Sequence, residues 1–413
     1  MNVFTQLASS RNHCAVKGRK VTFVVAENGT LYGCGSNEYG LGCSRTLKAV
    51  SLPESVKTVA IGDYSAFVIT ISGALYACGC NGFGQLGLGD DSSFPLMTKV
   101  PFAERVRAVE IKDNSTYVVT VSGALYACGR NDYGQVGLGD SLYRSTLTKV
   151  PLEESVKTVA SGGSFVFVLV VSGALYACGY NRADQLGLGD NSNRSVLTRV
   201  SVEESVKTVV VGSISTFVVT ASGAFYACGY NGSGQLGLGD DRDSSTLRRI
   251  QLDESVKTVV TGTNSMYVLT VSGALYACGD NYSGQLGLGD SSKRSTLTRV
   301  PLEESVKTVV TGSGSTYVLT ASGALYTCGN NWSGQLGLED DSCQQILTPT
   351  RVPLGESVQT VVVGGASILI ITVEEELYAC GNNDYGQLGL GDEKGSRSTP
   401  VRVSLNEIGK TME

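Results

Sequence analysis

The sequence of 413 residues contains one histidine, His13, and one tryptophan, Trp332. Nucleophilic triads and Cys-His pairs need a general base such as histidine, and His13 lies outside any recognisable motif. The twelve cysteines are spread along the chain, whereas zinc sites need clustered Cys or His. We therefore expect no enzyme activity, no catalytic residues, no metal site and no cofactor.

Charged residues are also scarce, at 17% of the chain against about 25% in an average soluble domain. The net charge is −6, the pI is about 5.1 and no basic cluster occurs, so the composition does not favour direct nucleic-acid binding. The longest apolar runs are of strand length, which predicts no transmembrane helix and no membrane insertion. Residues 1–20 lack the apolar core of a signal peptide, so we expect a location in the cytoplasm or the nucleus.

The sequence is rich in glycine, with 52 residues, and in one repeated motif. Leu-Tyr-x-Cys-Gly occurs eight times, once with Phe in the first place, beginning at Leu31, Leu75, Leu125, Leu175, Phe225, Leu275, Leu325 and Leu377. The spacing is a constant 50 residues from Leu75 to Leu325, with 44 residues before and 52 after. The predicted units are 3–52, 53–102, 103–152, 153–202, 203–252, 253–302, 303–354 and 355–405, followed by a tail at 406–413.

The fifth unit shows the secondary structure expected of every copy. Residues 206–211 and 216–221 read as β-branched strands, Ser222 and Gly223 as a two-residue turn, and 224–228 and 246–252 as two further strands. Four short antiparallel strands make a sheet with two apolar faces, and a closed ring of such sheets buries both. The predicted fold class is all-β: one β-propeller domain over 1–413 with four-stranded antiparallel blades.

The block Gly-Ala-Leu-Tyr-Ala-Cys-Gly-x-Asn-x-x-Gly-Gln-Leu-Gly-Leu-Gly-Asp, as at 73–90, resembles the repeat of the regulator of chromosome condensation family. The resemblance covers essentially the whole chain, with two departures. Cys stands where the family often has Trp, and Ser or Thr replaces a frequent His, as at Ser65 and Ser265. The resemblance implies seven blades, whereas the sequence offers eight units, so both numbers stay open.

Framework positions are nearly identical between units, and the variable positions gather in the same loops. Loops on a rigid scaffold are where binding is commonly placed. We therefore expect a non-catalytic scaffold that binds a protein partner through loops on one face. The alternative, implied by the resemblance, is guanine-nucleotide exchange on a Ran-like small GTPase. That activity uses a wedge inserted from one blade, and no insertion of that size interrupts the constant spacing.

The loop after each Cys-Gly carries an invariant Asn, expected to bond the turn backbone. Nearly every loop also carries an aromatic residue whose place shifts: Tyr39, Phe83, Tyr133, Tyr180, Tyr230, Tyr282, Trp332 and Tyr385. A ring needed only for packing should keep one place in every unit. The predicted partner-binding residues are Arg130, Tyr133, Tyr180, Arg182, Tyr230, Tyr282, Trp332 and Tyr385. The alternative is that the rings only cap the ends of the blades.

Four remaining features receive structural interpretations. The glycine-rich loops are not followed by a helix, so they do not favour phosphate binding. Acidic turns, as at Asp190 and Asn191, are read as turn chemistry rather than as calcium loops. The recurring Glu-Ser-Val-Lys segments, as at 154–157, are read as opposite charges paired on solvated turns. The eight repeat cysteines are predicted to be reduced and buried.

Overall fold

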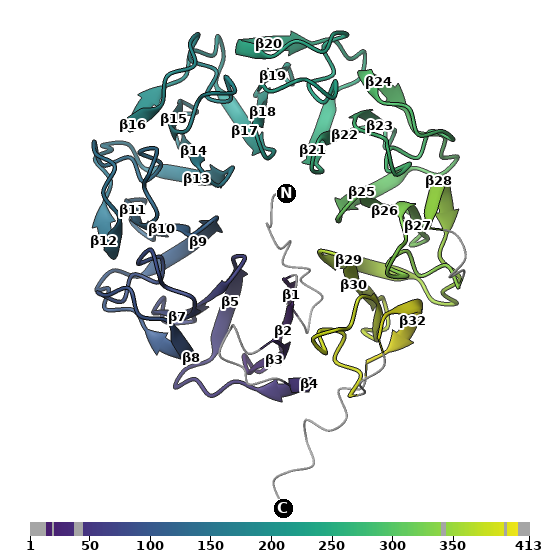
Figure 1. The fold of residues 1–413 in the computed structure, drawn as a ribbon, viewed down its shortest axis with the longest axis horizontal. Coiled ribbons are helices and arrows are strands. Elements are labelled where there is room, and N and C mark those ends of the chain that lie inside the picture. The colour runs from purple at the N-terminus through teal and green to yellow at the C-terminus, as the bar shows by residue number, and fades with distance from the viewer. Residues whose placement is uncertain (1–13, 19, 37–43, 340–343, 392–394, 404–413) are drawn as a thin grey trace, which may run out of the picture.

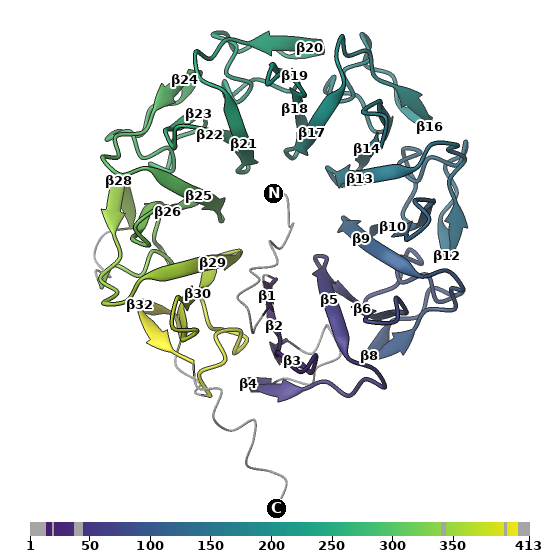
Figure 2. The same cartoon turned by 180° about the vertical axis from the view of Figure 1, so that it is seen from behind.

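The computed structural model is a ring of eight four-stranded antiparallel sheets, the blades of a β-propeller (Figures 1 and 2). It describes residues 14–18, 20–36, 44–339, 344–391 and 395–403. Within these ranges every regular element is a strand. No helix long and apolar enough to cross a membrane occurs in them. The predicted fold class is confirmed, and of the two blade numbers left open by the sequence, eight is correct.

The first four blades are built from consecutive strands. Blade 1 contains β1 (Cys14–Lys17), β2 (Val21–Val25), β3 (Leu31–Gly35) and β4 (Ser44–Ala49). Blade 2 contains β5 (Val56–Ile61), β6 (Ser65–Thr70), β7 (Leu75–Gly79) and β8 (Phe94–Lys99). Blade 3 contains β9 (Val106–Lys112), β10 (Ser115–Thr120), β11 (Leu125–Gly129) and β12 (Arg144–Lys149). Blade 4 contains β13 (Val156–Ser161), β14 (Phe165–Val170), β15 (Leu175–Gly179) and β16 (Arg194–Arg199).

The other four blades follow the same order. Blade 5 contains β17 (Val206–Val211), β18 (Ser215–Thr220), β19 (Phe225–Gly229) and β20 (Ser244–Ile250). Blade 6 contains β21 (Val256–Thr261), β22 (Ser265–Thr270), β23 (Leu275–Gly279) and β24 (Arg294–Arg299). Blade 7 contains β25 (Val306–Thr311), β26 (Ser315–Thr320), β27 (Leu325–Asn330) and β28 (Gln345–Arg351). Blade 8 contains β29 (Val358–Gly364), β30 (Ser367–Thr372), β31 (Leu377–Gly381) and β32 (Arg397–Arg402).

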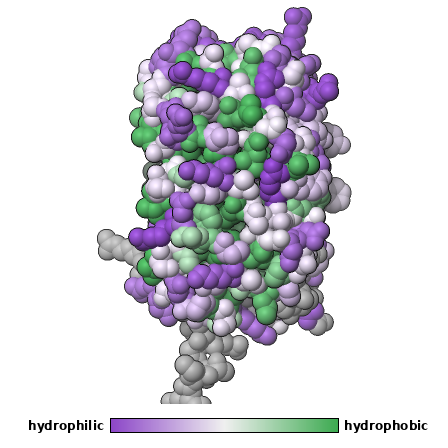
Figure 3. All heavy atoms as spheres, turned by 90° about the vertical axis from the view of Figure 1, so that its left-hand side faces the viewer, coloured by the Kyte–Doolittle hydropathy of each residue, from purple (hydrophilic) through white to green (hydrophobic). Residues whose placement is uncertain are grey.

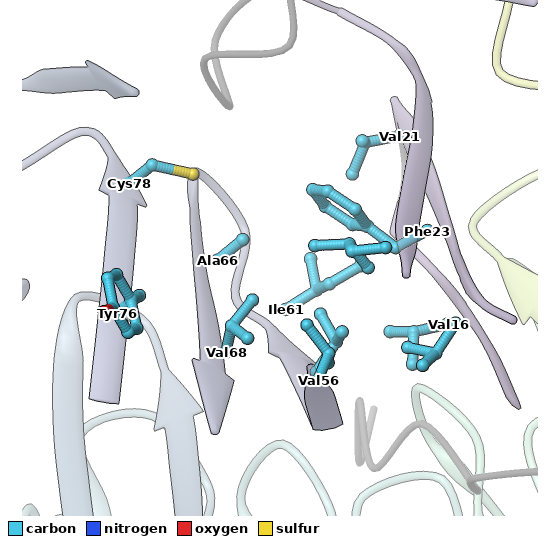
Figure 4. Packing of buried hydrophobic residues seen from close by; sticks show 12 residues of the cluster. Val16, Val21, Phe23, Val56, Ile61, Ala66, Val68, Tyr76 and Cys78 are labelled. Atoms are coloured by element: carbon cyan, nitrogen blue, oxygen red, sulfur yellow. The ribbon is translucent and has the colours of Figure 1, made fainter. Parts of the chain in front are cut away.

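The core of the molecule lies between the blades. The first strand of each blade borders the central opening and the fourth lies at the outer edge (Figure 1). The second strand is buried along its whole length, as in β18, because neighbouring blades cover both faces of the sheet. Such a strand reads as a continuous apolar and β-branched run instead of an alternating one. Figure 4 shows one of these layers, in which Val16 and Phe23 of blade 1 face Val56 and Ile61 of blade 2.

The ring closes between the first and the last repeat by side-chain packing. Ala15 and Val24 of blade 1 share a buried cluster with Leu369 and Ile371 of blade 8. Strand β1 accordingly contacts β29 on one side and β5 on the other. Within the described part of the chain, no blade is left with an uncovered apolar face. A repeat array that is closed in this way does not need polar capping repeats.

The antiparallel order gives the ring two different faces. On one, which we call the hairpin face, the turn between the second and third strands of one blade lies beside the start of the first strand of the next blade, and Val156 N donates to Gly123 O at 2.9 Å. On the other, the loop face, the loop after the third strand meets the turn after the first, and Tyr180 N donates to Ser164 O at 2.8 Å. The outer edge mixes polar and apolar side chains without separating them (Figure 3).

The Glu-Ser-Val-Lys segments lie on the hairpin face, and the predicted Glu–Lys pairing is wrong. In blade 4, Glu154 accepts hydrogen bonds from Ser172 Oγ at 2.5 Å and from Tyr176 Oη at 2.9 Å. Lys157 turns away from this glutamate, and its Nζ donates to Lys207 O of the next blade at 3.3 Å. The glutamate braces the hairpin of its own blade, while the lysine reaches across the boundary between blades.

Candidate binding surface on the loop face

A buried asparagine holds each loop of the loop face in shape. In blade 5, Asn231 Oδ1 accepts from Leu236 N at 2.9 Å, and Nδ2 donates to Asp240 O at 2.8 Å. The asparagine is completely buried. The same pair of bonds occurs at Asn81, Asn131, Asn181 and Asn281. The predicted structural role of this residue is confirmed, and the loops are rigid supports for their variable side chains.

The same loops also fasten each blade to the next. Gln185 O accepts from Thr216 Oγ1 at 2.8 Å and from the Cys228 thiol at 3.6 Å, both in the following blade. Farther along the loop, Gly189 N donates to Ser245 O at 2.8 Å. The glycine-rich block is therefore an arm laid over the neighbouring blade, which agrees with its interpretation as structural rather than phosphate-binding.

The repeat cysteines are buried free thiols, as predicted: Cys34, Cys78, Cys128, Cys178, Cys228, Cys278, Cys328 and Cys380. Burial raises the pKa of Cys34 to about 11 and the pKa of Cys78 to about 12. A Cβ placed on Gly187 would lie 2.9 Å from Cys228 Sγ. The arm of the preceding blade thus leaves no room for the bulky tryptophan that the resemblance leads one to expect at the cysteine.

The acidic turns of these loops cap their own backbone. Asp190 Oδ1 accepts from Ser192 N at 2.8 Å, and its other oxygen pairs with Arg194 at 2.6 Å. Asp90 and Asp240 accept the corresponding backbone bond from the residue two positions on. Turn chemistry accounts for these aspartates.

Five aromatic and cationic side chains of blades 2–4 interlock, and we call them the braced sector: Phe83, Arg130, Tyr133, Tyr143 and Tyr180. The rings of Tyr133 and Tyr180 meet edge to face, with centroids 4.9 Å apart, and those of Phe83 and Tyr143 do so at 5.3 Å. The guanidinium of Arg130 lies 5.5 Å from the centroid of Phe83 and is also paired with Asp132. Phe83, Arg130, Tyr133 and Tyr180 are half-buried, so the rings of this sector pack chiefly against one another.

Partial burial alone would raise the pKa of Asp132, but hydrogen bonds from Tyr143 and Arg130 lower it. The sequence analysis missed Tyr143 and its neighbour Leu142, which are 47% and 65% exposed. They stand where the equivalent turns carry Ser and Asn, at 192 and 193. Comparison of this later part of the loop between units could have found them.

Three aromatic residues of blades 6–8 project from the loop face, and we call them the open sector. Tyr282 is 78% exposed, Trp332 64% and Tyr385 46%. Tyr282 and Trp332 each follow the buried asparagine directly, so they occupy the same place on neighbouring blades. Lys20 Nζ lies 4.8 Å from the centroid of the Tyr385 ring.

The remaining predicted residues differ in exposure. Tyr230 is half-buried, and its Oη would be 2.3 Å from a Cβ on Gly232, so the ring covers that glycine. Arg182 is exposed. Tyr39 and His13 lie outside the described residues. The predicted set therefore divides into rings that cap blade ends, as the alternative interpretation holds, and the projecting rings of the open sector.

Comparison with protein-family models identifies the repeat. A model described as "Regulator of chromosome condensation (RCC1) repeat" matches residues 72–119, 122–169, 172–219, 272–319, 322–371 and 374–409. A second model of the same description matches residues 56–85 and 106–135. The matches extend over more than half of the chain. The chain belongs to the RCC1 repeat family.

Solved structures agree with this family at the level of the fold. Yeast RCC1 (Prp20) bound to Kap60 is 18% identical, with a TM-score of 0.64 over 80% of this chain and 84% of that chain. Human WBSCR16 is 20% identical, with a TM-score of 0.65 over 80% and 95%. Prp20p from Saccharomyces cerevisiae, described with its binding properties to Gsp1p and histones, is 19% identical, with a TM-score of 0.65 over 86% and 91%. No curated protein sequence matches the chain.

Proposed function

We propose that this RCC1 repeat propeller is a non-catalytic scaffold that binds a protein partner through its loop face, with the open sector as the main contact. The observation that carries the proposal is the exposure of Tyr282 and Trp332 at one place on adjacent blades, 78% and 64%. Large aromatic side chains held in water by a rigid loop are typical of interface hot spots. Because the loops are already braced, binding costs little ordering of the backbone.

Guanine-nucleotide exchange on a Ran-like GTPase is the alternative function that family membership suggests. Each described blade consists of four strands, and blades 2–6 are spaced evenly along the chain, without an added wedge. This regularity supports a scaffold over an exchange factor. We further propose an intracellular setting, in the cytoplasm or nucleus, because buried thiols in such number suit a reducing compartment.

The test compares two double variants of the full-length chain. The first, Tyr282→Ala with Trp332→Ala, should lower recovery of the partner from extracts of the source cells at least tenfold, about 1.4 kcal/mol. The control, Val171→Ala with Val271→Ala, removes two residues that are 67% and 68% exposed on the hairpin face. It should leave recovery unchanged.

Equal recovery with both variants would contradict the proposal, provided that circular dichroism shows both to be folded. Release of a fluorescent nucleotide from a Ran-like GTPase is measured alongside. No acceleration above the spontaneous rate is expected, and a large acceleration would assign exchange activity instead.

A further inference from the structure

The hairpin face carries three concentric sets of charges. Innermost, at the second position of the first strand, are Lys57, Arg107, Lys157, Lys207, Lys257 and Lys307, which we call the inner ring. Outside them lie the hairpin-bracing glutamates Glu54, Glu104, Glu154, Glu204, Glu254, Glu304 and Glu356. At the ends of the outer strands are Lys99, Lys149, Arg199, Arg249, Arg299, Arg351 and Arg402, the outer ring.

The glutamates accept hydrogen bonds from the hairpins of their own blades, as in blades 2 and 4. Hydrogen bonds from Ser172 and Tyr176 lower the pKa of Glu154, and Arg199 of the outer ring adds to this effect. In blade 2, Ser72 and Thr70 lower the pKa of Glu54, again with help from the outer ring, here Lys99. The bracing glutamates therefore balance the outer ring and leave the inner ring without carboxylate partners.

Three members of the inner ring, Arg107, Lys157 and Lys307, donate hydrogen bonds to backbone carbonyls of the next blade. Arg107 donates to Val156 O at 2.7 Å and to Lys157 O at 3.1 Å, and Lys307 Nζ donates to Gln359 O at 3.1 Å. All six side chains are exposed, and within the described part of the chain none forms an ion pair. Six cations thus surround the central opening on strands that Figure 1 shows converging there. An opening lined by charge of one sign concentrates ions of the other sign.

The ring is not uniform. In blades 4–7 an exposed carboxylate precedes each inner cation by four positions: Glu153, Glu203, Asp253 and Glu303. Blades 2 and 3 have Pro53 and Ala103 instead, and blade 3 adds Arg105. In blade 8 the position is taken by Gln359, and in blade 1 it lies outside the described residues. The excess of positive charge is therefore greatest over blades 2 and 3.

We propose that the inner ring binds a compact, multiply phosphorylated small molecule at the central opening of the hairpin face. One cation from each of six blades, spread around a circle, matches a ligand whose charges are themselves spread around a ring. A linear acidic peptide would offer its charges along a line and would meet fewer of the cations at once. Lysine and arginine are the usual partners of phosphate oxygens. This site lies on the face opposite the proposed partner surface and stands independently of it.

Inositol hexakisphosphate is the probe, titrated into the full-length chain by calorimetry at physiological salt. One molecule per chain is expected to bind. The variant Lys57→Gln, Arg107→Gln and Lys157→Gln should weaken binding at least tenfold, in line with the loss of three charge contacts. The matched control replaces the outer cations of the same blades, Lys99→Gln, Lys149→Gln and Arg199→Gln. It changes the net charge equally and should alter affinity less than threefold.

Removing nearby negative charge should act in the opposite direction. Glu153→Gln with Glu203→Gln should tighten binding of the probe severalfold, because these carboxylates oppose it without contacting the inner ring. The proposal fails if the probe does not bind saturably, or if the two triple variants weaken binding equally. It also fails if a poly-glutamate peptide binds more tightly than the probe, which would assign the ring to an acidic polypeptide.

Discussion

At the scale of the residue, Lys17 is the place where ring closure departs most from the repeat. It ends β1, at the position that buried Val211 holds in blade 5, and it is only 1% exposed. Its Nζ donates to Thr22 Oγ1 at 2.9 Å and to Gln387 O of blade 8 at 2.8 Å. Burial lowers the pKa of Lys17 to about 8. The contact between the first blade and the last therefore includes a buried charged group, and burying that charge costs free energy on folding.

Replacing Lys17 by methionine should stabilise the protein at pH 7, because an apolar side chain avoids the cost of burying a charge. The advantage should shrink as pH rises from 8 towards about 10.4. Over that range the unfolded lysine keeps its proton while the folded one loses it, so the unmodified chain gains up to about 1.4 kcal/mol per pH unit relative to the variant. Urea unfolding of both proteins at several pH values measures the difference. A difference in unfolding free energy that does not change with pH would contradict the lowered pKa of Lys17.

The sequence allowed some residue roles to be predicted and not others. The invariant asparagine and the repeat cysteines interact with the backbone of their own or the adjacent copy, so their constancy reveals what they do. The loop aromatics depend on which variable side chain the next blade offers. Tyr133 is covered because Tyr180 reaches it, whereas Tyr282 meets no such ring in the described residues. Reading one unit at a time could not separate these cases.

At the scale of the element, the glycines of the loop arm have different tasks. In blade 2, Gly87 has φ +70°, and a Cβ there would lie 3.2 Å from Leu147 Cγ and 3.3 Å from Cys128 Sγ of blade 3. Gly82 has no heavy atom within 4 Å of its Cβ position and lies outside the left-handed region. One glycine lets the arm lie against the next blade, and the other is a simple loop residue.

Gly87→Ala should therefore lower the free energy of unfolding by about 1–3 kcal/mol through backbone strain and crowding. Gly82→Ala, in the same loop, should be neutral or stabilising by up to about 1 kcal/mol, since it only restricts the unfolded chain. Denaturant unfolding of the two variants side by side gives the comparison. Equal losses would show that the arm tolerates no change at all and that contact with blade 3 is not the cause.

The Glu-Ser-Val-Lys segment shows why an element can be located correctly and still be misread. Its strand and turn positions follow from local pattern, but its hydrogen-bond partners come from a hairpin 18 residues on and from the next blade 50 residues on. Opposite charges three residues apart suggest pairing only if the segment is considered alone. The misreading matters, since it is the unpaired lysines that create the inner ring.

At the scale of the whole molecule, the repeat count determined the number of blades. Each unit supplies all four strands of its own blade, so the ring needs no strand exchanged between its ends, and eight units give eight blades. The family resemblance implied seven blades. It could not determine the number, because the number of blades depends on how many copies of the repeat a chain contains and not on the sequence of one repeat. What the sequence could not provide was how the last loop meets the first blade. There Gly391 N donates to Arg45 O at 3.0 Å, repeating the contact made between the other blades.

The same architecture makes the whole ring sensitive to alkali. Eight thiols are buried between blades, and burial raises the pKa of each one, to about 11 for Cys34 and about 12 for Cys328 and Cys380. A thiol in the unfolded chain ionises near pH 8.5. Above that pH, its ionisation lowers the free energy of the unfolded state by about 1.4 kcal/mol per pH unit. Because folded thiols keep their protons, stability is complete below that pH and is lost as pH rises through it. Eight such groups lose roughly 10 kcal/mol per pH unit, comparable to the whole stability of a domain.

We therefore expect cooperative unfolding between about pH 9 and pH 10.5, followed by circular dichroism with a reductant present. Cys178→Ala with Cys228→Ala should make the pH dependence of the unfolding free energy between pH 8.5 and 9.5 about one quarter less steep, whatever the variant loses at neutral pH. In this range the buried tyrosines, which ionise near pH 10 when unfolded, contribute little. A slope that stays unchanged in the variant would mean that the thiols are not the groups whose protons the fold retains.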